Sequence, residues 1–236
     1  MEKNKYDTLN ASPLNFAETE MWMGIIPASP DGKLPRRMAY VRQLRAIEFR
    51  DGGVEFNVYA PDAQSVEVSG TRNTRWGQEK HALHKTKDGW WQALIPGIPA
   101  GVQFLYYFFD GREHLYEHAP ICYAHNRLCN FVDVPDPEFD FYDFKDVPHG
   151  AVRCEYYRSS FTGTLRSCWV YTPPCYDADT EKHYPVLYLL HGGGENETGW
   201  FWQGKINLIL DNLIAEGKCK EMIAVANFGH AYAPDR

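Results

Sequence analysis

The segment from Tyr184 to Gly194 reads Tyr-Pro-Val-Leu-Tyr-Leu-Leu-His-Gly-Gly-Gly. Its strand-forming part, Pro185–Leu190, is apolar on both faces, as a parallel strand covered by helices requires. The glycines let the chain turn sharply and let another molecule approach the backbone closely. Backbone N–H groups in such a turn can bind the charged oxygen of a tetrahedral intermediate. The segment therefore predicts a parallel sheet with an oxyanion-binding turn, and a plain glycine-rich turn remains the alternative.

The residues around this segment predict the rest of the same sheet. A helix is expected over Gln203–Glu216, because isoleucine and leucine recur there at helical spacing and Gly217 can end the helix. The predicted strands are a hairpin of Val152–Ser159 with Leu165–Thr172, and a buried strand at Met222–Ala226. We therefore expect residues 151–236 to form an α/β unit, joined through a connector at 135–150 to what precedes it.

Residues 46–134 have a different pattern, with short alternating strands separated by proline and glycine. The predicted strands are Val54–Tyr59, Ser65–Ser69, Gly89–Ile95 and Gln103–Phe109. This spacing is typical of a β-sandwich. Residues 1–45 contain several prolines and predict an irregular arm, in which Met21, Trp22 and Met23 serve either as a lid or as an apolar clip.

Specific stretches resemble known families. Leu189–Gly194, followed by Glu195–Trp200, and Leu210–Gly217 resemble carbohydrate esterase family 1, with its feruloyl and acetylxylan esterases, and the related enterochelin esterases. Tyr59–Ala63 and Asp88–Trp91 resemble the early-set β-sandwich related to family-48 carbohydrate-binding modules. The resemblance implies an immunoglobulin-like β-sandwich followed by the first part of an α/β-hydrolase sheet.

The resemblance also implies roles for individual residues. Gly193 would be the first candidate for the oxyanion-hole donor that this loop supplies, with Gly194 the second candidate, while His191 would buttress the turn. Trp200 and Trp202 would floor the site against a phenolic or sugar ring, or else be core aromatics at a helix start. The family uses Ser, Asp or Glu, and His as its triad and needs no cofactor, yet the sequence contains no G-x-S-x-G motif.

Two functions follow from these patterns. The first is the N-terminal portion of a serine carboxylic-ester hydrolase that acts on acetyl, feruloyl or enterochelin-type esters of carbohydrates or similar molecules; this chain alone is expected to be inactive. The second is a non-catalytic carbohydrate-binding module with a hydrolase remnant. For the second, Trp76, Trp90 and Trp91 are the candidate sugar-stacking residues, although Trp90 and Trp91 should point to opposite faces of one strand.

Composition excludes several other classes of function. The net charge is −7 and no basic run is present, so neither nucleic acid nor a membrane is an expected partner. No secretory signal is apparent, and six cysteines without paired spacing indicate reduced thiols and a cytoplasmic location. The His114–Cys129 segment fits no common zinc spacing, so no metal is expected. An open edge on the predicted sheet is compatible with a homo-oligomer.

Overall fold

The computed structural model describes residues 46–71, 76–178 and 180–231. The expected arm at 1–45, with Met21, Trp22 and Met23, lies outside the described residues. The chain divides into two compact units, each described here by itself: the first ends at residue 122 and includes 128–136, and the second consists of 123–127 and the residues from 137 onward. None of the described helices is long and apolar enough to cross a membrane.

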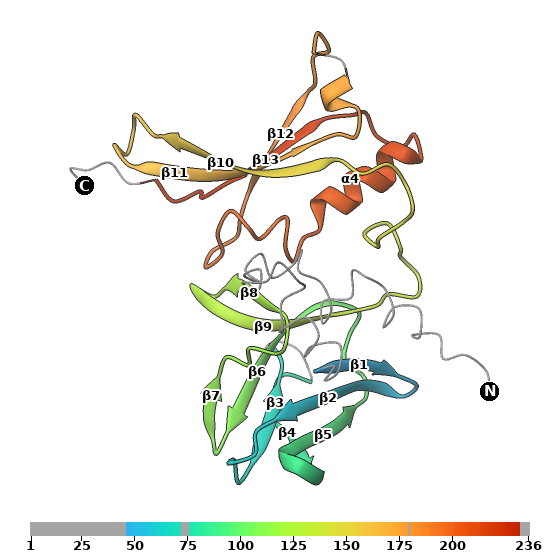
Figure 1. Ribbon diagram of the computed structural model, residues 1–236, viewed down its shortest axis with the longest axis vertical. Helices are drawn as coiled ribbons and strands as arrows, with labels where there is room; N and C mark the ends of the chain where they lie inside the picture. The colour runs from blue at the N-terminus through green and yellow to red at the C-terminus, as the bar shows by residue number, and fades with distance from the viewer. Residues whose placement is uncertain (1–45, 72–75, 179, 232–236) are drawn as a thin grey trace, which may run out of the picture. The chain divides into compact units, whose positions relative to one another are not determined.

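The first unit is a β-sandwich-like arrangement of short strands (Figure 1). Its strands are β1 (Ile47–Arg50), β2 (Gly53–Tyr59), β3 (Val66–Ser69), β4 (His81–Lys85), β5 (Trp90–Ile95), β6 (Gly101–Phe109), β7 (Arg112–His114), β8 (Ile121–Ala124) and β9 (Arg127–Val134), with a 3-10 turn η1 (Lys87–Gly89). Their order is β1-β2-β5-β4-β3-β6-β9-β8, with β7 paired to β6. The tip of the β8–β9 hairpin, residues 123–127, belongs to the second unit. The four strands predicted from the sequence are confirmed as β2, β3, β5 and β6.

The sequence did not predict β4, because its residues do not alternate between apolar and polar side chains. β4 has the exposure pattern of a mostly solvent-facing strand, with Leu83 as its buried residue. It forms because β3 and β5 pair with it on either side, and such long-range pairing leaves no local pattern in a polar stretch. The core of the unit gathers the inward-facing residues of the predicted strands, among them Phe56, Val58 and Tyr107.

The second unit is a four-stranded sheet with one α-helix. The elements are β10 (Ala151–Arg158), β11 (Leu165–Thr172), a 3-10 turn η2 (Tyr176–Ala178), β12 (Val186–Leu190), α4 (Ile206–Ala215) and β13 (Ile223–Asn227). The strand order is β10-β11-β13-β12, in which β12 and β13 are parallel and the other pairs are antiparallel. All four strands and the helix lie where the sequence predicts them, with ends that differ by up to three residues.

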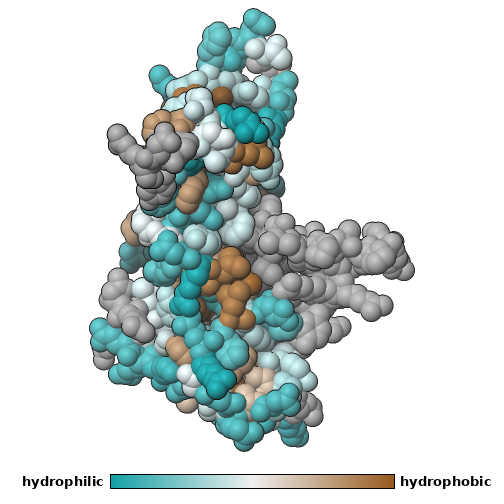
Figure 2. Space-filling model, turned by 90° about the vertical axis from the view of Figure 1, so that its left-hand side faces the viewer, coloured by the Kyte–Doolittle hydropathy of each residue, from teal (hydrophilic) through white to brown (hydrophobic). Residues whose placement is uncertain are grey.

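The open edge that the sequence predicts lies at β12. Among the described strands, β12 pairs with β13 alone, and its Tyr188 and Leu190 are 72% and 66% exposed. Of the β12 residues, Leu189 alone packs against the core cluster, which α4 forms with β11 and β13 on one face of the sheet (Figure 1). Exposed hydrophobic side chains occur in both units, and Figure 2 shows brown patches among hydrophilic residues on one face.

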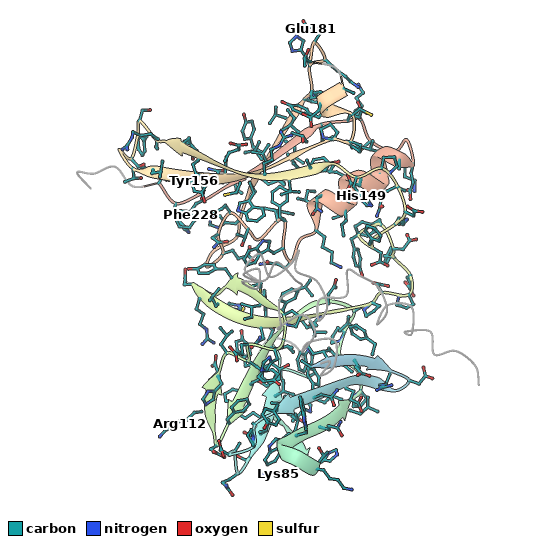
Figure 3. The ribbon with its side chains drawn as sticks, viewed as in Figure 1. Lys85, Arg112, His149, Tyr156, Glu181 and Phe228 are labelled. Carbon is teal, nitrogen blue, oxygen red and sulfur yellow. The ribbon has the colours of Figure 1, made fainter. Side chains whose placement is uncertain are left out.

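One buried carboxylate connects the helix, the connector and the sheet. Asp211, on α4, is 2% exposed and accepts hydrogen bonds from the Tyr171 hydroxyl at 2.7 Å and the Gly150 N–H at 2.9 Å. Its second oxygen lies 2.8 Å from Nδ1 of His149, which Figure 3 shows beside α4. Burial and the bond to Asp211 raise the pKa of Tyr171, so its hydroxyl remains a donor. The neighbouring Asn212 donates to backbone oxygens of Phe141 and Asp143.

We expect Asp211→Ala to destabilise the second unit by about 3 kcal/mol, because it leaves the Tyr171 hydroxyl and the Gly150 N–H without their acceptor. Urea unfolding followed by tryptophan fluorescence measures this loss. Asn207→Ala, one turn earlier on the same helix, is the control and should change stability by less than about 0.5 kcal/mol. Equal effects of the two substitutions would contradict a role for the carboxylate.

Candidate functional site

The candidate site lies where β12 and β13 end. Because the two strands are parallel and Leu190 is in register with Asn227, His191–Gly194 and Phe228–His230 emerge at the same edge of the sheet. The Gly229 N–H donates to Nε2 of His191 at 2.9 Å, and the His191 ring stacks on Phe228 with centroids 5.4 Å apart. Nδ1 of His191 lies 2.8 Å from the Gly192 carbonyl oxygen. His191 thus connects the ends of the two strands.

The glycines after His191 form a tight turn. The Glu195 N–H donates to the Gly192 carbonyl at 3.2 Å, and Gly194 has a φ of +83°, the combination found at the third position of a type II turn. The Glu195 carboxylate accepts the Gly192 N–H at 3.2 Å, which closes the turn from its other side. The Gly194 carbonyl accepts the N–H of Asn126, a residue of the same unit, at 2.7 Å.

These bonds leave two donors of the turn available. Among the described residues, neither Gly193 nor Gly194 donates its N–H to another group. The space around Gly193 is open, since a Cβ built there meets no atom within 4 Å. Gly193 is also exposed, so another molecule can approach this part of the turn closely.

The structure separates the two tryptophans that follow the turn. Trp200 is 38% exposed, and its indole N–H donates to the Leu190 carbonyl at the end of β12, at 2.9 Å. Trp202 packs against the core cluster, perpendicular to Trp169 with centroids 6.2 Å apart. Trp202 therefore fits the core interpretation, while Trp200 has a free face beside the turn.

A cavity of about 790 Å³ opens at the same edge of the sheet. Its walls come from the β10–β11 hairpin, the loop after the turn and the end of β13, and its lining includes Tyr156, Arg166, Ser167, Glu197, Phe228 and His230. Figure 3 shows Tyr156 and Phe228 close together at this end of the sheet. The Ser167 hydroxyl donates to the Glu197 carboxylate at 2.7 Å, and the Arg166 guanidinium donates to the Phe228 carbonyl. The lining thus combines aromatic rings with polar groups of both charges.

The sequence alone did not single out these cavity residues. Glu195 and Glu197 are half-buried and accept hydrogen bonds from the Gly192 N–H and the Ser167 hydroxyl. Phe228 and His230 did carry a signal, since they follow a buried strand as His191–Gly194 do. The hairpin residues Arg166 and Ser167 carried none, because only the fold of the sheet brings them to this edge.

A buried lysine lies at the start of α4. Lys205 is 8% exposed, and its Nζ lies 4.7 Å from the centre of the Tyr142 ring. Burial lowers the pKa of Lys205 to about 7. Because the unfolded chain retains this proton up to the ordinary lysine pKa, the contribution of Lys205 favours folding increasingly as the pH rises above 7.

The tryptophans of the first unit have different environments. Trp76 and Trp91 are 5% and 6% exposed, and their indole N–H groups donate to Gln103 and to the Ala60 carbonyl. Both belong to the core, so neither presents a face on which a sugar can stack, and the prediction that Trp76 and Trp91 bind sugar is wrong. Trp90 is half-buried on the opposite face of β5, where its ring lies 5.1 Å from that of Tyr59.

The histidine- and cysteine-rich segment is spread over several environments. His114 stacks on Phe109 with centroids 4.7 Å apart, while Cys122 and Cys129 are buried. Within the described ranges, no three His, Cys, Asp or Glu side chains are grouped as metal ligands.

Comparison with known proteins links both units to carbohydrate enzymes. Residues 43–120 match the family described as carbohydrate-binding module 48 (isoamylase N-terminal domain). An endo-1,4-beta-xylanase/feruloyl esterase of Xylanibacter ruminicola is 38% identical over 96% of this chain and 35% of that protein. The chain therefore spans about a third of the length of this relative. The first unit contains the family-48 module that the sequence predicted, and the homology to esterases is likewise confirmed.

Two solved structures are similar to parts of this chain. A CE1 ferulic acid esterase of Anaeromyces mucronatus in complex with ferulic acid is 35% identical over 41% of this chain and 35% of that chain, with a TM-score of 0.38. The enterobactin esterase of Shigella flexneri matches 76% of this chain and 52% of that chain with a TM-score of 0.52 and 14% identity. At that identity the second similarity concerns the fold alone.

Substitution of the two adjacent glycines by alanine should have opposite effects on stability. Gly194→Ala places a side chain at a φ of +83° and its Cβ 3.1 Å from the backbone of His125, so we expect a loss of about 1 to 2 kcal/mol. Gly193→Ala meets no atom within 4 Å and should be neutral or stabilising by up to about 1 kcal/mol. Chemical denaturation of both variants measures the difference, and equal losses would contradict the turn.

Proposed function

We propose that this chain is the N-terminal portion of a serine carboxylic-ester hydrolase. The proposal is supported by the match to the family-48 carbohydrate-binding module and by the homology to a xylanase/feruloyl esterase. The substrates of this hydrolase are acylated carbohydrates or similar acetyl, feruloyl or enterochelin-type esters. In this proposal, the second unit forms the first part of an α/β-hydrolase sheet. The reaction needs no cofactor, because hydroxyl, imidazole and carboxylate groups carry it.

The observation that carries the proposal is the turn after β12, whose Gly193 and Gly194 N–H groups have no acceptor among the described residues. An α/β-hydrolase takes one oxyanion donor from a loop after a central strand and the other from the residue after its nucleophile. Gly193 is the proposed donor, because its N–H is free among the described residues and its surroundings are open. Gly194 is the second candidate, and its conformation sets the direction of the turn.

The remaining residues hold this donor in place. His191 accepts the Gly229 N–H and so fixes the start of the turn against the end of β13. The Glu195 carboxylate accepts the Gly192 N–H, which fixes the conformation at the start of the turn. Preorganised donors of this kind lower the barrier because they need no rearrangement when the oxyanion forms.

The cavity beside the turn suits the substrate that the proposal names. Tyr156 and Phe228 offer rings for a sugar or phenolic face, while Arg166 and Glu197 offer charged groups for hydroxyls. Trp200, with its exposed face, is the proposed floor of the site. The nucleophile, the acid and the base of the reaction are not assigned to residues of this chain, since no G-x-S-x-G motif occurs in it.

The first test is the gene and the protein that it encodes. We expect the reading frame beyond codon 236 to encode G-x-S-x-G followed by an aspartate and a histidine, and its product to hydrolyse methyl ferulate or p-nitrophenyl acetate. Replacement of that serine by alanine should lower the rate at least about a thousandfold, and the 236-residue chain alone should hydrolyse these esters at the background rate. A stop codon after residue 236, or full activity of this chain, contradicts the proposal.

In the active protein, Gly193→Pro tests the oxyanion role directly. The second position of a type II turn accepts proline, and the Gly193 N–H makes no hydrogen bond among the described residues, so the turn should survive. The substitution removes the donor, and we expect kcat to fall about 100- to 1,000-fold with the melting temperature retained. Gly193→Ala, which keeps the N–H, is the matched control. An unchanged kcat in the proline variant would remove Gly193 as the donor.

A second function, glycan binding by the first unit, is favoured by one observation. Trp90 and Tyr59 form a ring pair on the outer face of β2 and β5, and Tyr59 is 38% exposed. Adjacent rings that remain partly open can stack on sugar faces. Glycan binding and catalysis are compatible within one protein, so this function adds to the first or stands alone.

Trp90→Ala should weaken the affinity of the chain for a polysaccharide at least about tenfold, because it removes half of the ring pair. Affinity electrophoresis in glycogen, starch and xylan gels measures the effect. Trp91→Ala is the contrasting variant: its indole is buried, so we expect a loss of stability instead. If the native chain shows no retardation in any of the three gels, glycan binding by this unit is excluded.

A further inference from the structure

Two of the six cysteines are brought together in the first unit. Cys122 on β8 and Cys129 on β9 are 0% and 3% exposed, and their Sγ atoms lie 3.6 Å apart. The spacing of cysteines along the sequence did not indicate a pair. The hairpin creates it, because β8 and β9 are neighbours in the sheet and the chain reverses between them.

The turn of this hairpin determines which residues face each other. His125 and Asn126 have φ values of 54° and 61°, as both central residues of a type I′ turn require. The Phe131 N–H donates to the Pro120 carbonyl at 3.1 Å, which places residues 120 and 131 opposite each other. Counting inward from that bond, Cys122 lies directly opposite Cys129, on the same face of the ribbon. The pair is therefore held by backbone register and does not depend on flexible side chains.

We propose that Cys122 and Cys129 are a site of disulfide formation within the β8–β9 hairpin. The bond would require the sulfurs to approach from 3.6 Å to about 2.05 Å, a movement that side-chain rotation can supply when the Cβ atoms face each other. The oxidant is a disulfide compound, such as a low-molecular-weight glutathione-type disulfide. One cysteine thiolate attacks it and releases a thiol; the second thiolate then attacks the mixed disulfide and releases the other thiol. Two cysteine protons and two electrons thus pass to the oxidant.

The other cysteines differ from this pair. Cys154 and Cys168 are on adjacent strands, but Cys154 is opposite Trp169 and Cys168 is opposite Glu155. Cys154 and Cys175 are exposed, and burial raises the pKa of the thiols of Cys168 and Cys219. The pairing is thus specific to the hairpin. Because both of its sulfurs are buried, exchange must occur while the hairpin forms or opens, and the completed bond is shielded from external reductant.

Peptide mapping can test the site without a variant, because Arg127 lies between the two cysteines. The chain is refolded in a mixture of oxidised and reduced glutathione, denatured, blocked with N-ethylmaleimide and digested with trypsin. We expect the peptides 113–127 and 128–145, each with one cysteine, to be recovered joined and two hydrogens lighter than their sum. Reduction before blocking should separate them.

Two variants test which cysteines are joined. Cys154→Ser, at an exposed cysteine, should leave the joined peptides unchanged, whereas Cys122→Ser should abolish them and leave Cys129 blocked by the maleimide. Recovery of both peptides separately and fully blocked from the refolded wild-type chain would overturn the proposal, as would a link from either cysteine to a different one. Circular dichroism of the refolded chain confirms that the peptides come from folded material. The outcome is independent of esterase activity and glycan binding.

Discussion

The parallel pairing of β12 with β13 is the constraint on which the candidate site depends. Parallel strands end at the same edge of a sheet, so residues 38 positions apart in sequence become neighbours there. The bond from the Gly229 N–H to His191 is the direct consequence, and it anchors the glycine turn. The β10–β11 hairpin reaches the same edge because β11 runs antiparallel to β13, which brings Arg166 and Ser167 into the wall of the cavity.

The helix between these two strands is held by polar bonds as well as apolar packing. Ile206 and Leu210 pack on the sheet, which is the ordinary contribution of an amphipathic helix. Asp211 adds direction, since a buried carboxylate with two donors on Tyr171 and Gly150 tolerates one orientation of the helix. Each residue of Leu210–Asp211–Asn212 therefore has a defined contact: Leu210 packs in the core, Asp211 binds the strand and the connector, and Asn212 binds the connector.

The two aromatic pairs considered for ligand binding show why residue type alone does not identify a site. Trp90 and Trp91 are adjacent in sequence, yet strand geometry sends one outward and the other into the core. Trp200 and Trp202 follow the same turn, and one of them is exposed while the other packs on Trp169. In each pair the exposed member alone can contact a ligand, and this distinction depends on packing against distant residues.

Local periodicity in the sequence determined most of the secondary structure. Alternation predicted β2 and β3, and aromatic runs bounded by proline or glycine predicted β5 and β6. Helical spacing predicted α4, and the His-Gly-Gly-Gly segment predicted a tight turn after an apolar strand. These patterns reflect contacts within a few residues. The tertiary structure decided the rest: the pairing of β4, the cavity lined by Glu197 and Phe228, and the meeting of Cys122 with Cys129. Each depends on strand register between segments whose partners no local pattern specifies, and register is set by the packing of the whole sheet.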